Sequence, residues 1–427
     1  MKHLTAAIAV ALHATVLVAQ TPDTLRGSAV ALTRAGAIAA ALANNPQLEI
    51  AREQTAQARA RRVSAIAIPD PALTYSLDNQ PGFLQLGNAG QRNATLGIAI
   101  PFPDKFRLRN TAANADIRSF ELTYAGLRQQ LAAQTSRAYD SLLVALRHQE
   151  DFASSRDLAR DFLAKTKARF EGGTAAKLDV IRAQVAAAQA ANDLIAGERN
   201  VVTASDALDR LIGRPLGTPI APADSLTVPP PLPDVALLEQ AALASRPELA
   251  SLASQQVGAH ASTTLAREFW LPDFTLSAQR DYGPDGTGVL YSAGIALPLP
   301  VFFWQHTKGE IAESQHRERE LSAGYRDLQA QVSQDVRASY ASASTALRQA
   351  IYIRDALLPS AREAYRVATV SYGLGGSSAL DVLDARRNLI DAQSQYADAL
   401  AAANSARADL ERAVANPLVQ YPTRREP

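Results

Sequence analysis

One short stretch occurs twice in this chain of 427 residues and constrains its architecture. Residues 170–181 read Phe-Glu-Gly-Gly-Thr-Ala-Ala-Lys-Leu-Asp-Val-Ile, and residues 372–383 read Tyr-Gly-Leu-Gly-Gly-Ser-Ser-Ala-Leu-Asp-Val-Leu. Each copy places an aromatic residue, a glycine-rich break and a Leu-Asp-Val restart between two alanine-rich segments of helical period. Such a break predicts a tight hairpin between two antiparallel helices. The separation of 202 residues between the copies predicts two similar halves.

Residues 1–20 predict a cleaved signal peptide. A basic start is followed by an apolar run to Val18 and then by small and polar residues. The run is too short for a membrane-spanning helix, which needs about 20 apolar residues. No later stretch is long and apolar enough either, so any insertion into a membrane is predicted to use β-strands. No cysteine follows the signal to carry a lipid anchor.

The composition argues against several classes of function. Lysine plus arginine (43) nearly balances aspartate plus glutamate (42), so no basic footprint indicates nucleic acid. The chain has no cysteine, and its six histidines and one methionine form no spaced cluster that predicts a metal site. It contains neither Gly-x-Ser-x-Gly nor His-Glu-x-x-His. We therefore expect the chain to have no catalytic residue, no cofactor and no metal, and we do not expect it to be an enzyme.

Each half opens with a short helical segment, predicted at residues 29–43 in the first half and 235–244 in the second, and a proline-marked restart. In the first predicted repeat, residues 21–212, Asn44 with Gln47 and the early Pro46 predict a fresh helix to about residue 68. The second repeat, residues 235–415, has the same opening. There Ser245 and Glu248 predict a capping box before a helix to about residue 269.

After these helices the apolar period changes from 3.6 to 2, which predicts β-hairpins at about residues 72–101 and 273–298. A half-buried sheet on a soluble domain is the commoner source of such alternation. Here, however, the alternate face is small or polar and suits a water-filled lumen. Even the smallest membrane barrels use about eight strands, so four strands would have to be shared between chains. Three chains would give twelve.

Long helices are predicted at residues 104–170 and 305–371, with return helices at 178–212 and 379–414. About 66 residues at 1.5 Å each make a rod of roughly 100 Å, which needs partner helices along its length. Each half is predicted to supply one long rod and one broken rod. Pro359 is expected to kink the second long rod locally.

Two segments lie outside the repeats. Residues 213–234 are rich in proline and predict a linker or a small belt around the helices. The tail, residues 416–427, is short and polar, and we expect it to be poorly ordered.

The order and duplication of these motifs resemble the TolC family of outer-membrane efflux proteins across essentially the whole mature chain. The closest likeness is to the heavy-metal, RND-associated (CzcC/CusC-like) branch, carried by Asn45-Pro46-Gln47-Leu48, Pro69-Asp70-Pro71, residues 294–300 and residues 372–385. The resemblance implies a mainly α protomer with membrane β. Its four β-strands would contribute to a shared twelve-stranded barrel in a homotrimer, continued by a long periplasmic α-helical barrel.

The resemblance also implies location and partners. The chain would lie in the outer membrane, in contact with its lipid, and extend into the periplasm. A periplasmic adaptor (membrane fusion) protein and an inner-membrane pump of the RND type would load it. The chain itself would be a passive exit duct of a tripartite efflux system.

Candidate site residues follow from the same resemblance. Asp381 and Asp384 match the family's acidic motif near the channel entrance, and Tyr372 matches an aromatic residue that helps to hold that end shut. The first repeat differs, because it reads Asp179-Val-Ile-Arg182 and so replaces the second acid. The adaptor would dock at the hairpin glycines Gly172, Gly173, Gly375 and Gly376.

Each of these residues also has a purely structural interpretation. Ser378 and Asp381 are spaced as a capping box, whereas Asp384 has no capping role and is the better pore candidate. Arg182, Arg386 and Arg387 are expected to be solvated or to pair with acids on a neighbouring helix. The glycines are turn residues that tolerate positive φ.

Two further functions remain open from the sequence. One is a soluble periplasmic coiled-coil scaffold or adaptor, and the other is an outer-membrane channel for type I secretion. Recovery as a soluble monomer would favour the scaffold, whereas extraction from membranes as an oligomer would favour a channel.

Overall fold

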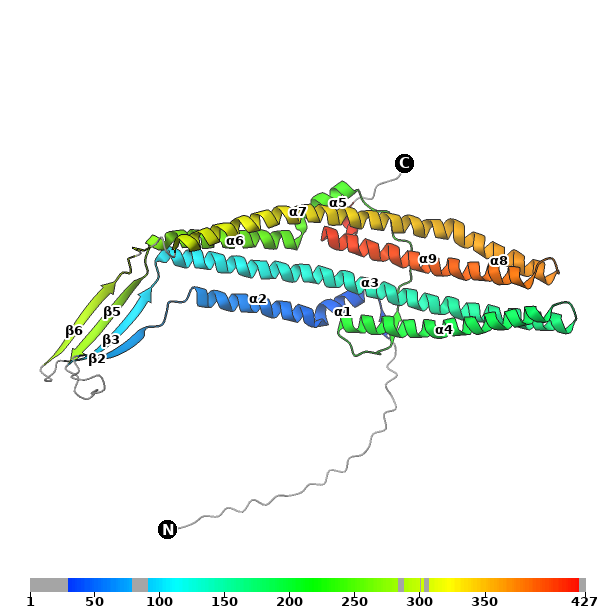
Figure 1. Ribbon diagram of the computed structural model, residues 1–427, viewed down its shortest axis with the longest axis horizontal. Coiled ribbons are helices and arrows are strands. Elements are labelled where there is room, and N and C mark those ends of the chain that lie inside the picture. The colour runs from blue at the N-terminus through cyan, green and yellow to red at the C-terminus, as the bar shows by residue number, and fades with distance from the viewer. Residues whose placement is uncertain (1–29, 79–90, 283–287, 300, 303–306, 422–427) are drawn as a thin grey trace, which may run out of the picture.

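A computed structural model describes residues 30–78, 91–282, 288–299, 301–302 and 307–421. The molecule is long and narrow, with a β-sheet at one end and helical rods running away from it (Figure 1). The predicted signal peptide lies outside the described residues. Within the described ranges, no helix is both long and apolar enough to cross a membrane.

The first half contains two short helices, two strands and a helical hairpin. Its elements are β1 (Val30–Leu32), α1 (Arg34–Asn44), α2 (Pro46–Ala65), β2 (Ala72–Asp78), β3 (Gln91–Ile100), α3 (Pro103–Glu171) and α4 (Lys177–Ile212). Helix α3 runs without interruption for 69 residues, which corresponds to about 100 Å. Helix α4 returns antiparallel to it from the glycine-rich turn.

The second half repeats this order. Its elements are β4 (Ile220–Pro222), α5 (Val235–Ser245), α6 (Pro247–Arg267), the 3-10 turn η2 (Glu268–Trp270), β5 (Phe274–Tyr282), β6 (Val289–Ala296), α7 (Thr307–Tyr352), the π segment η3 (Ile353–Leu357), α8 (Leu358–Gly373) and α9 (Ala379–Val414). A 3-10 turn, η4 (Leu418–Gln420), follows α9. The observed hairpins and long helices thus lie close to the predicted positions.

The rods lie side by side in one layer (Figure 1). Helix α3 contacts α2 and α4 on one side and α6 and α9 on the other, and α7 and α8 complete the row against α6 and α9. Each half therefore supplies one long rod, α3 or α7–α8, and one rod that is broken into two helices, α2 with α4 or α6 with α9. Small buried side chains such as Ala183, Ala190, Ala392 and Ala403 line the contacts, which lets the helices approach closely.

The four long strands form one antiparallel sheet in the order β2-β3-β5-β6. The central pair joins the two halves, with a register from Arg92 opposite Tyr282 to Ile100 opposite Phe274. Within the described residues, β2 and β6 each pair on one side only. The sheet of one chain is therefore open at both edges.

The two faces of this sheet differ in chemistry. One face carries exposed apolar side chains, including Leu73, Tyr75, Leu96, Tyr291 and Ile295. The opposite face carries a network of polar side chains. Its hydrogen bonds run from Thr95 Oγ1 to Gln279 Oε1 (3.2 Å), from Asn93 Nδ2 to Asp78 Oδ2 (2.7 Å), from Ser292 Oγ to Asp281 Oδ2 (3.2 Å) and from Gln279 to Asp281. The predicted alternation is present in the described strands, while residues 79–90 and 283–287 of the two predicted hairpins lie outside the described residues.

The helix starts differ in detail from the sequence prediction. Asn45, not Asn44, caps α2, because its side chain accepts from the backbone N–H of Gln47 at 2.9 Å. The predicted Ser245 capping box is wrong, since Ser245 closes α5 and Arg246 occupies the cap position without a capping side-chain bond. Instead, Arg246 Nε donates to the carbonyl of Ala413 at 2.8 Å, as Asn45 Nδ2 donates to that of Leu211 at 2.9 Å. In each repeat, the residue just before the proline of the second helix thus donates a side-chain hydrogen bond to a C-terminal carbonyl of the return helix, α4 or α9.

The second long rod contains the π segment immediately before Pro359. The N–H of Leu358 donates to the carbonyl of Ile353, five residues back. Proline has no N–H and crowds the carbonyl four residues before it, so one wider turn accommodates the ring. The expected local kink takes the form of a π segment, and α3 has no such segment at the equivalent place.

The linker docks on α3 through strands that the sequence did not predict. β1 and β4 form a short parallel pair, so the segment at residues 30–32 is a strand rather than the expected helix. Tyr139 Oη donates to the Leu32 carbonyl at 2.7 Å, and Arg34 forms an ion pair with the buried Asp140. Burial raises the pKa of Asp140 to about 6, although the Arg34 guanidinium opposes this.

The tail is more ordered than expected over its first residues. Leu418 is fully buried among Leu238, Leu410 and Val414, and Tyr421 packs against the same cluster. The apolar contacts of Leu418 therefore hold the described part of the tail against α5 and α9. Residues 422–427 lie outside the described chain.

Candidate channel entrance at the hairpin ends

The two glycine-rich turns have the same backbone geometry. In the first, Thr174 N–H donates to the Arg169 carbonyl at 2.8 Å and Gly173 N–H to that of Phe170 at 2.9 Å. In the second, Gly376 N–H donates to Ser371 at 2.8 Å and Gly375 N–H to Tyr372 at 3.1 Å. This pair of bonds defines a Schellman turn.

Only one glycine of each pair meets the expected backbone requirement. Gly173 and Gly375 have φ of +74° and +82°, a region that side chains with a Cβ rarely adopt. Gly172 has a φ of −77°, and the φ of Gly376 is not in the positive region either. A side chain at Gly376 would instead meet Ser371 Oγ at 2.9 Å.

Tyr372 lies inside the hairpin end rather than on its surface. Its ring centroid is 5.4 Å from that of Phe162, and the Arg169 guanidinium lies 4.4 Å from the Tyr372 centroid. Arg169 also donates to the Tyr372 carbonyl, and Tyr372 Oη donates to Thr166 Oγ1 at 3.5 Å. The equivalent residue of the first repeat, Phe170, is 43% exposed. Tyr372 therefore ties α8 to the end of α3.

The carboxylate of Asp381 is engaged in a capping box. The Ser378 N–H donates to Asp381 Oδ2 at 2.8 Å, and the Asp381 N–H donates to Ser378 Oγ at 3.2 Å. The Ser378 N–H and the Ser378 hydroxyl both donate to the Asp381 carboxylate, and these two hydrogen bonds hold the pKa of Asp381 below its usual value. The predicted capping role is confirmed. The first repeat has no such box, because Ala176 stands at the N-cap of α4.

The second acidic position differs between the repeats. Asp384 is exposed, and among the described residues it has no ion pair and no side-chain hydrogen bond. In the first repeat, Arg182 Nη1 lies 3.8 Å from Asp179 Oδ1, so the two charges offset each other. The second hairpin end thus carries a free carboxylate where the first carries an ion pair.

Arg386 corrects the sequence prediction. It is buried rather than solvated, its Nη1 donates to the Ser155 carbonyl at 3.3 Å, and its Nε has no partner in the described chain. Burial lowers the pKa of Arg386. Its position four residues after the buried Val382 and three before Leu389 places it on the apolar stripe of α9, which was the available signal. Arg387 is exposed and lies 4.0 Å from Asp391 on the same helix.

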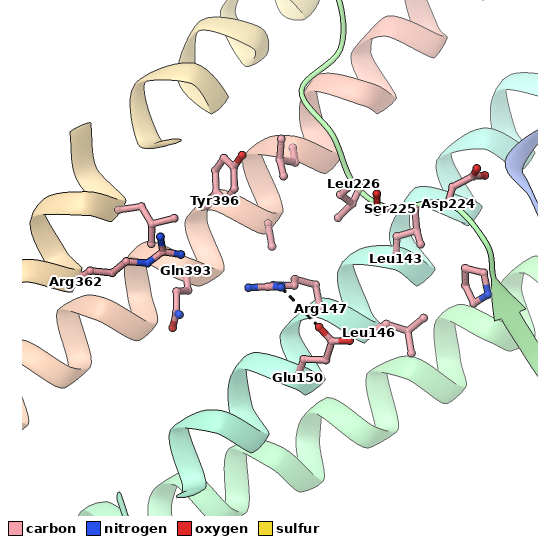
Figure 2. A pocket seen from close by; sticks show the side chains of 14 residues that line it. Leu143, Leu146, Arg147, Glu150, Asp224, Ser225, Leu226, Arg362, Gln393 and Tyr396 are labelled. Atoms are coloured by element: carbon pink, nitrogen blue, oxygen red, sulfur yellow. Dashed lines mark ion pairs between the residues drawn. The ribbon is translucent and has the colours of Figure 1, made fainter. Parts of the chain in front are cut away.

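A cavity of about 380 Å³ lies farther along the rods, where α3, α8, α9 and the segment after β4 meet (Figure 2). Leu226 and Tyr396 contribute apolar surface, and Arg147 reaches Glu150 at 3.7 Å. Glu150 is 20 residues before Phe170 on α3, which corresponds to about 30 Å. None of the predicted site residues lines this cavity, and within the described chain no three acidic or histidine side chains cluster as metal ligands.

These features define a class of protein: an elongated subunit with an open four-stranded sheet, apolar on one face, at one end and two linked helical hairpins at the other. The chain matches the outer membrane efflux protein family over residues 37–214 and again over 238–416. It belongs to this family.

Individual relatives agree with this assignment. The chain is 24% identical over 387 residues to the cobalt-zinc-cadmium resistance protein CzcC of Cupriavidus metallidurans, covering 91% of each protein. The CmeC outer membrane channel of Campylobacter jejuni superposes with a TM-score of 0.76 at 18% identity, over 89% of this chain and 85% of CmeC. CusC gives the same TM-score and identity, over 89% and 91% of the two chains.

Family membership and fold together establish the general function. The chain is a TolC-like outer-membrane efflux channel protein that extends into the periplasm. The predicted fold class is confirmed, and the soluble scaffold is set aside.

Proposed function

We propose that three copies of the chain form one continuous exit duct. The observation that carries the proposal is a four-stranded sheet that is open at both edges and apolar on one face. Strands β6 and β2 run in opposite directions, so β6 of one copy can pair antiparallel with β2 of the next. Three sheets then close twelve strands, which removes every open edge. The rods of the three copies continue the wall as a helical tunnel.

The hairpin ends are the proposed periplasmic mouth. In this arrangement Asp384 and the capped Asp381 of three copies surround the entrance, and their negative charge attracts cations. The paired Asp179 and Arg182 contribute little net charge there. The contact of Arg169 with Tyr372 holds the two hairpins of one copy together and favours a closed resting entrance.

The same ends offer a docking surface for a periplasmic adaptor. Besides the four turn glycines, Leu374 is 85% exposed, and Leu178 and Leu380 are about half exposed. Exposed apolar side chains at a loop tip are typical of protein contacts. The adaptor would connect the duct to an inner-membrane pump, which we propose to be of the RND type.

The duct is proposed to be passive, without a covalent step or a cofactor. Relatives carry names that refer to metal resistance, antibiotic efflux and alkaline protease secretion. A shared duct architecture with such different cargo supports a division of labour in which the pump and adaptor select the substrate.

Membrane extraction tests this proposal. The full-length protein is expected in the outer-membrane fraction and, after mild detergent extraction, as a trimer that heating in dodecyl sulfate converts to monomer. Reconstituted trimer is expected to give single-channel conductance in planar bilayers. Recovery of a monomer in the soluble periplasmic fraction would contradict the proposed duct.

A further inference from the structure

The exposed apolar face of the sheet carries two arginines near its loop end. Arg280 on β5 lies opposite Tyr291 and Ala94, and Arg92 on β3 lies opposite Tyr282 and Leu77. The two arginines are thus diagonal neighbours on adjacent strands, at about 7–8 Å between backbones. Both are exposed.

The rows nearer the helices are apolar. They comprise Ile100 with Phe274, then Ile98 with Leu276 and Ile295, then Leu96 with Ala278 and Ala293. Arg280 lies six residues beyond Phe274, or about 20 Å along the strand. The arginines therefore stand at the outer margin of the apolar band.

Among the described residues, the surroundings of the two arginines contain aromatic rings but no counterion. The Arg280 guanidinium lies 4.7 Å from the Tyr282 centroid and 5.8 Å from that of Tyr291. Within the described residues, neither arginine forms an ion pair. The nearest acids along these strands, Asp78 and Asp281, belong to the opposite face and are hydrogen-bonded to polar neighbours there.

A cation on a lipid-facing surface is strongly destabilising at the midplane of a bilayer and costs little near its interfaces. Two unpaired guanidinium groups at the margin of an apolar band consequently favour a position at headgroup level. Guanidinium groups bind phosphate oxygens in a bidentate geometry, and the tyrosines supply the interfacial aromatic surface that accompanies such sites.

We propose that Arg92 and Arg280, with Tyr282, bind the phosphate of an anionic lipid headgroup in the outer leaflet. The inference rests on the proposed barrel, in which the apolar face points to lipid. It adds a lipid-recognition site that lies at the end of the molecule opposite the channel entrance.

Native mass spectrometry of the detergent-solubilised trimer tests the site with diphosphoryl lipid A as the probe. The double variant Arg92→Gln/Arg280→Gln is expected to lose about 30-fold in affinity, because each cationic side chain near an anionic headgroup contributes about fivefold. The charge-matched control Arg319→Gln/Arg326→Gln changes exposed arginines of α7 and should bind like wild type. Arg92→Lys/Arg280→Lys retains the charges and should retain part of the affinity.

Each result separates the possibilities. Equal lipid binding by wild type and the Gln double variant would overturn the site. Complete displacement of the lipid by 10-fold lower concentrations of inorganic phosphate would assign the site to free phosphate instead. The same spectra report the number of subunits. If the wild-type protein is not a trimer, the proposed barrel is refuted, and the headgroup site that rests on it falls with it. If the Gln variant lacks a trimer, the wild-type trimer is compared with the two lipid forms: tighter binding of diphosphoryl than of monophosphoryl lipid A would support the site, and equal binding would overturn it.

Discussion

Arg182 and Asp384 occupy equivalent positions of the two repeats, 202 residues apart, and carry opposite charges. Asp384→Ala is expected to reduce the cation-to-anion permeability ratio of reconstituted channels. A unit charge about 8 Å away contributes about 0.5 kcal/mol in water, so three copies give a roughly two- to tenfold reduction at 0.1 M salt. Arg182→Asp should raise the ratio, and both effects should shrink at 1 M salt.

The reversal potential across a planar bilayer under a salt gradient measures this ratio. Glu53→Ala, on α2 and far from the hairpin ends, makes the same change in net charge and serves as the control. If Asp384→Ala and Glu53→Ala give the same ratio as wild type, Asp384 does not line the pore.

Asp140 gives the protein a pH-dependent stability. Its carboxyl faces Arg34 and, from the linker, Asp224, and burial raises its pKa to about 6. The unfolded chain releases this proton near pH 3.9 and the folded chain near pH 6, so the folded chain binds the proton more tightly. The free energy of unfolding therefore falls as the pH rises from about 4 to about 6. The contribution is on the order of 2–3 kcal/mol.

Asp140→Asn should therefore flatten the change in melting temperature between pH 5 and pH 7, measured by circular dichroism. Burial also raises the pKa values of Asp151 and Asp209, so part of the slope should remain. Asp116→Asn, an exposed acid on the same helix, is the matched control. An unchanged slope in Asp140→Asn would exclude Asp140 as its source.

Single residues were predictable from sequence where the interaction is local. The Ser378–Asp381 capping box involves positions three apart, and the spacing predicts it. Arg386 was predicted wrongly: its place on the apolar stripe of α9 indicated burial, but its hydrogen-bond partner, Ser155 of α3, could not be found from spacing. The contact of Arg169 with Tyr372 joins residues 203 positions apart, and no spacing rule finds it.

At the scale of elements, this contact links the ends of α3 and α8. Arg169→Ala would remove both the stacking of the guanidinium on Tyr372 and its hydrogen bond to the Tyr372 carbonyl. The combined loss is about 2–4 kcal/mol, which is enough to loosen the second hairpin. We expect a higher conductance of the resting channel in planar bilayers.

Arg366→Ala is the control for this variant, because Arg366 is exposed on α8 and pairs only with Glu363 three residues away among the described residues. It should conduct like wild type. A resting conductance of Arg169→Ala equal to that of the control would show that the contact does not hold the entrance closed.

Long elements were easier to predict than short ones. The 69-residue α3 and the four strands have periodic apolar patterns that need no tertiary information. The three-residue strands β1 and β4 have no such pattern, and they exist because they pair with each other beside α3. The π segment was expected only as a kink, since the proline marks the place and not the form of the distortion.

At the scale of the whole molecule, the protomer is incomplete by itself. Its apolar sheet face and its two open edges are exposed in a single chain. The strand count predicts this incompleteness from the sequence, whereas the pairing of β6 with β2 of another copy depends on contacts between chains. Closure of the barrel is therefore the decisive property to test.

The absence of cysteine allows a clean test of closure, because introduced thiols are the only ones present. Ser76→Cys on β2 is combined in turn with Leu290→Cys, Ser292→Cys and Gly294→Cys on β6, all on the polar face of the sheet. In a closed ring each chain donates one thiol to each neighbour.

Of the three pairs, the one whose two positions lie opposite each other across the β6–β2 contact should therefore give covalent trimers on mild oxidation in membranes, resolved by gel electrophoresis after heating. Ser76→Cys alone lacks the second thiol and should remain monomeric. Covalent products that extend without limit would indicate an open array of sheets, and monomers in all three pairs would exclude contact between β2 and β6.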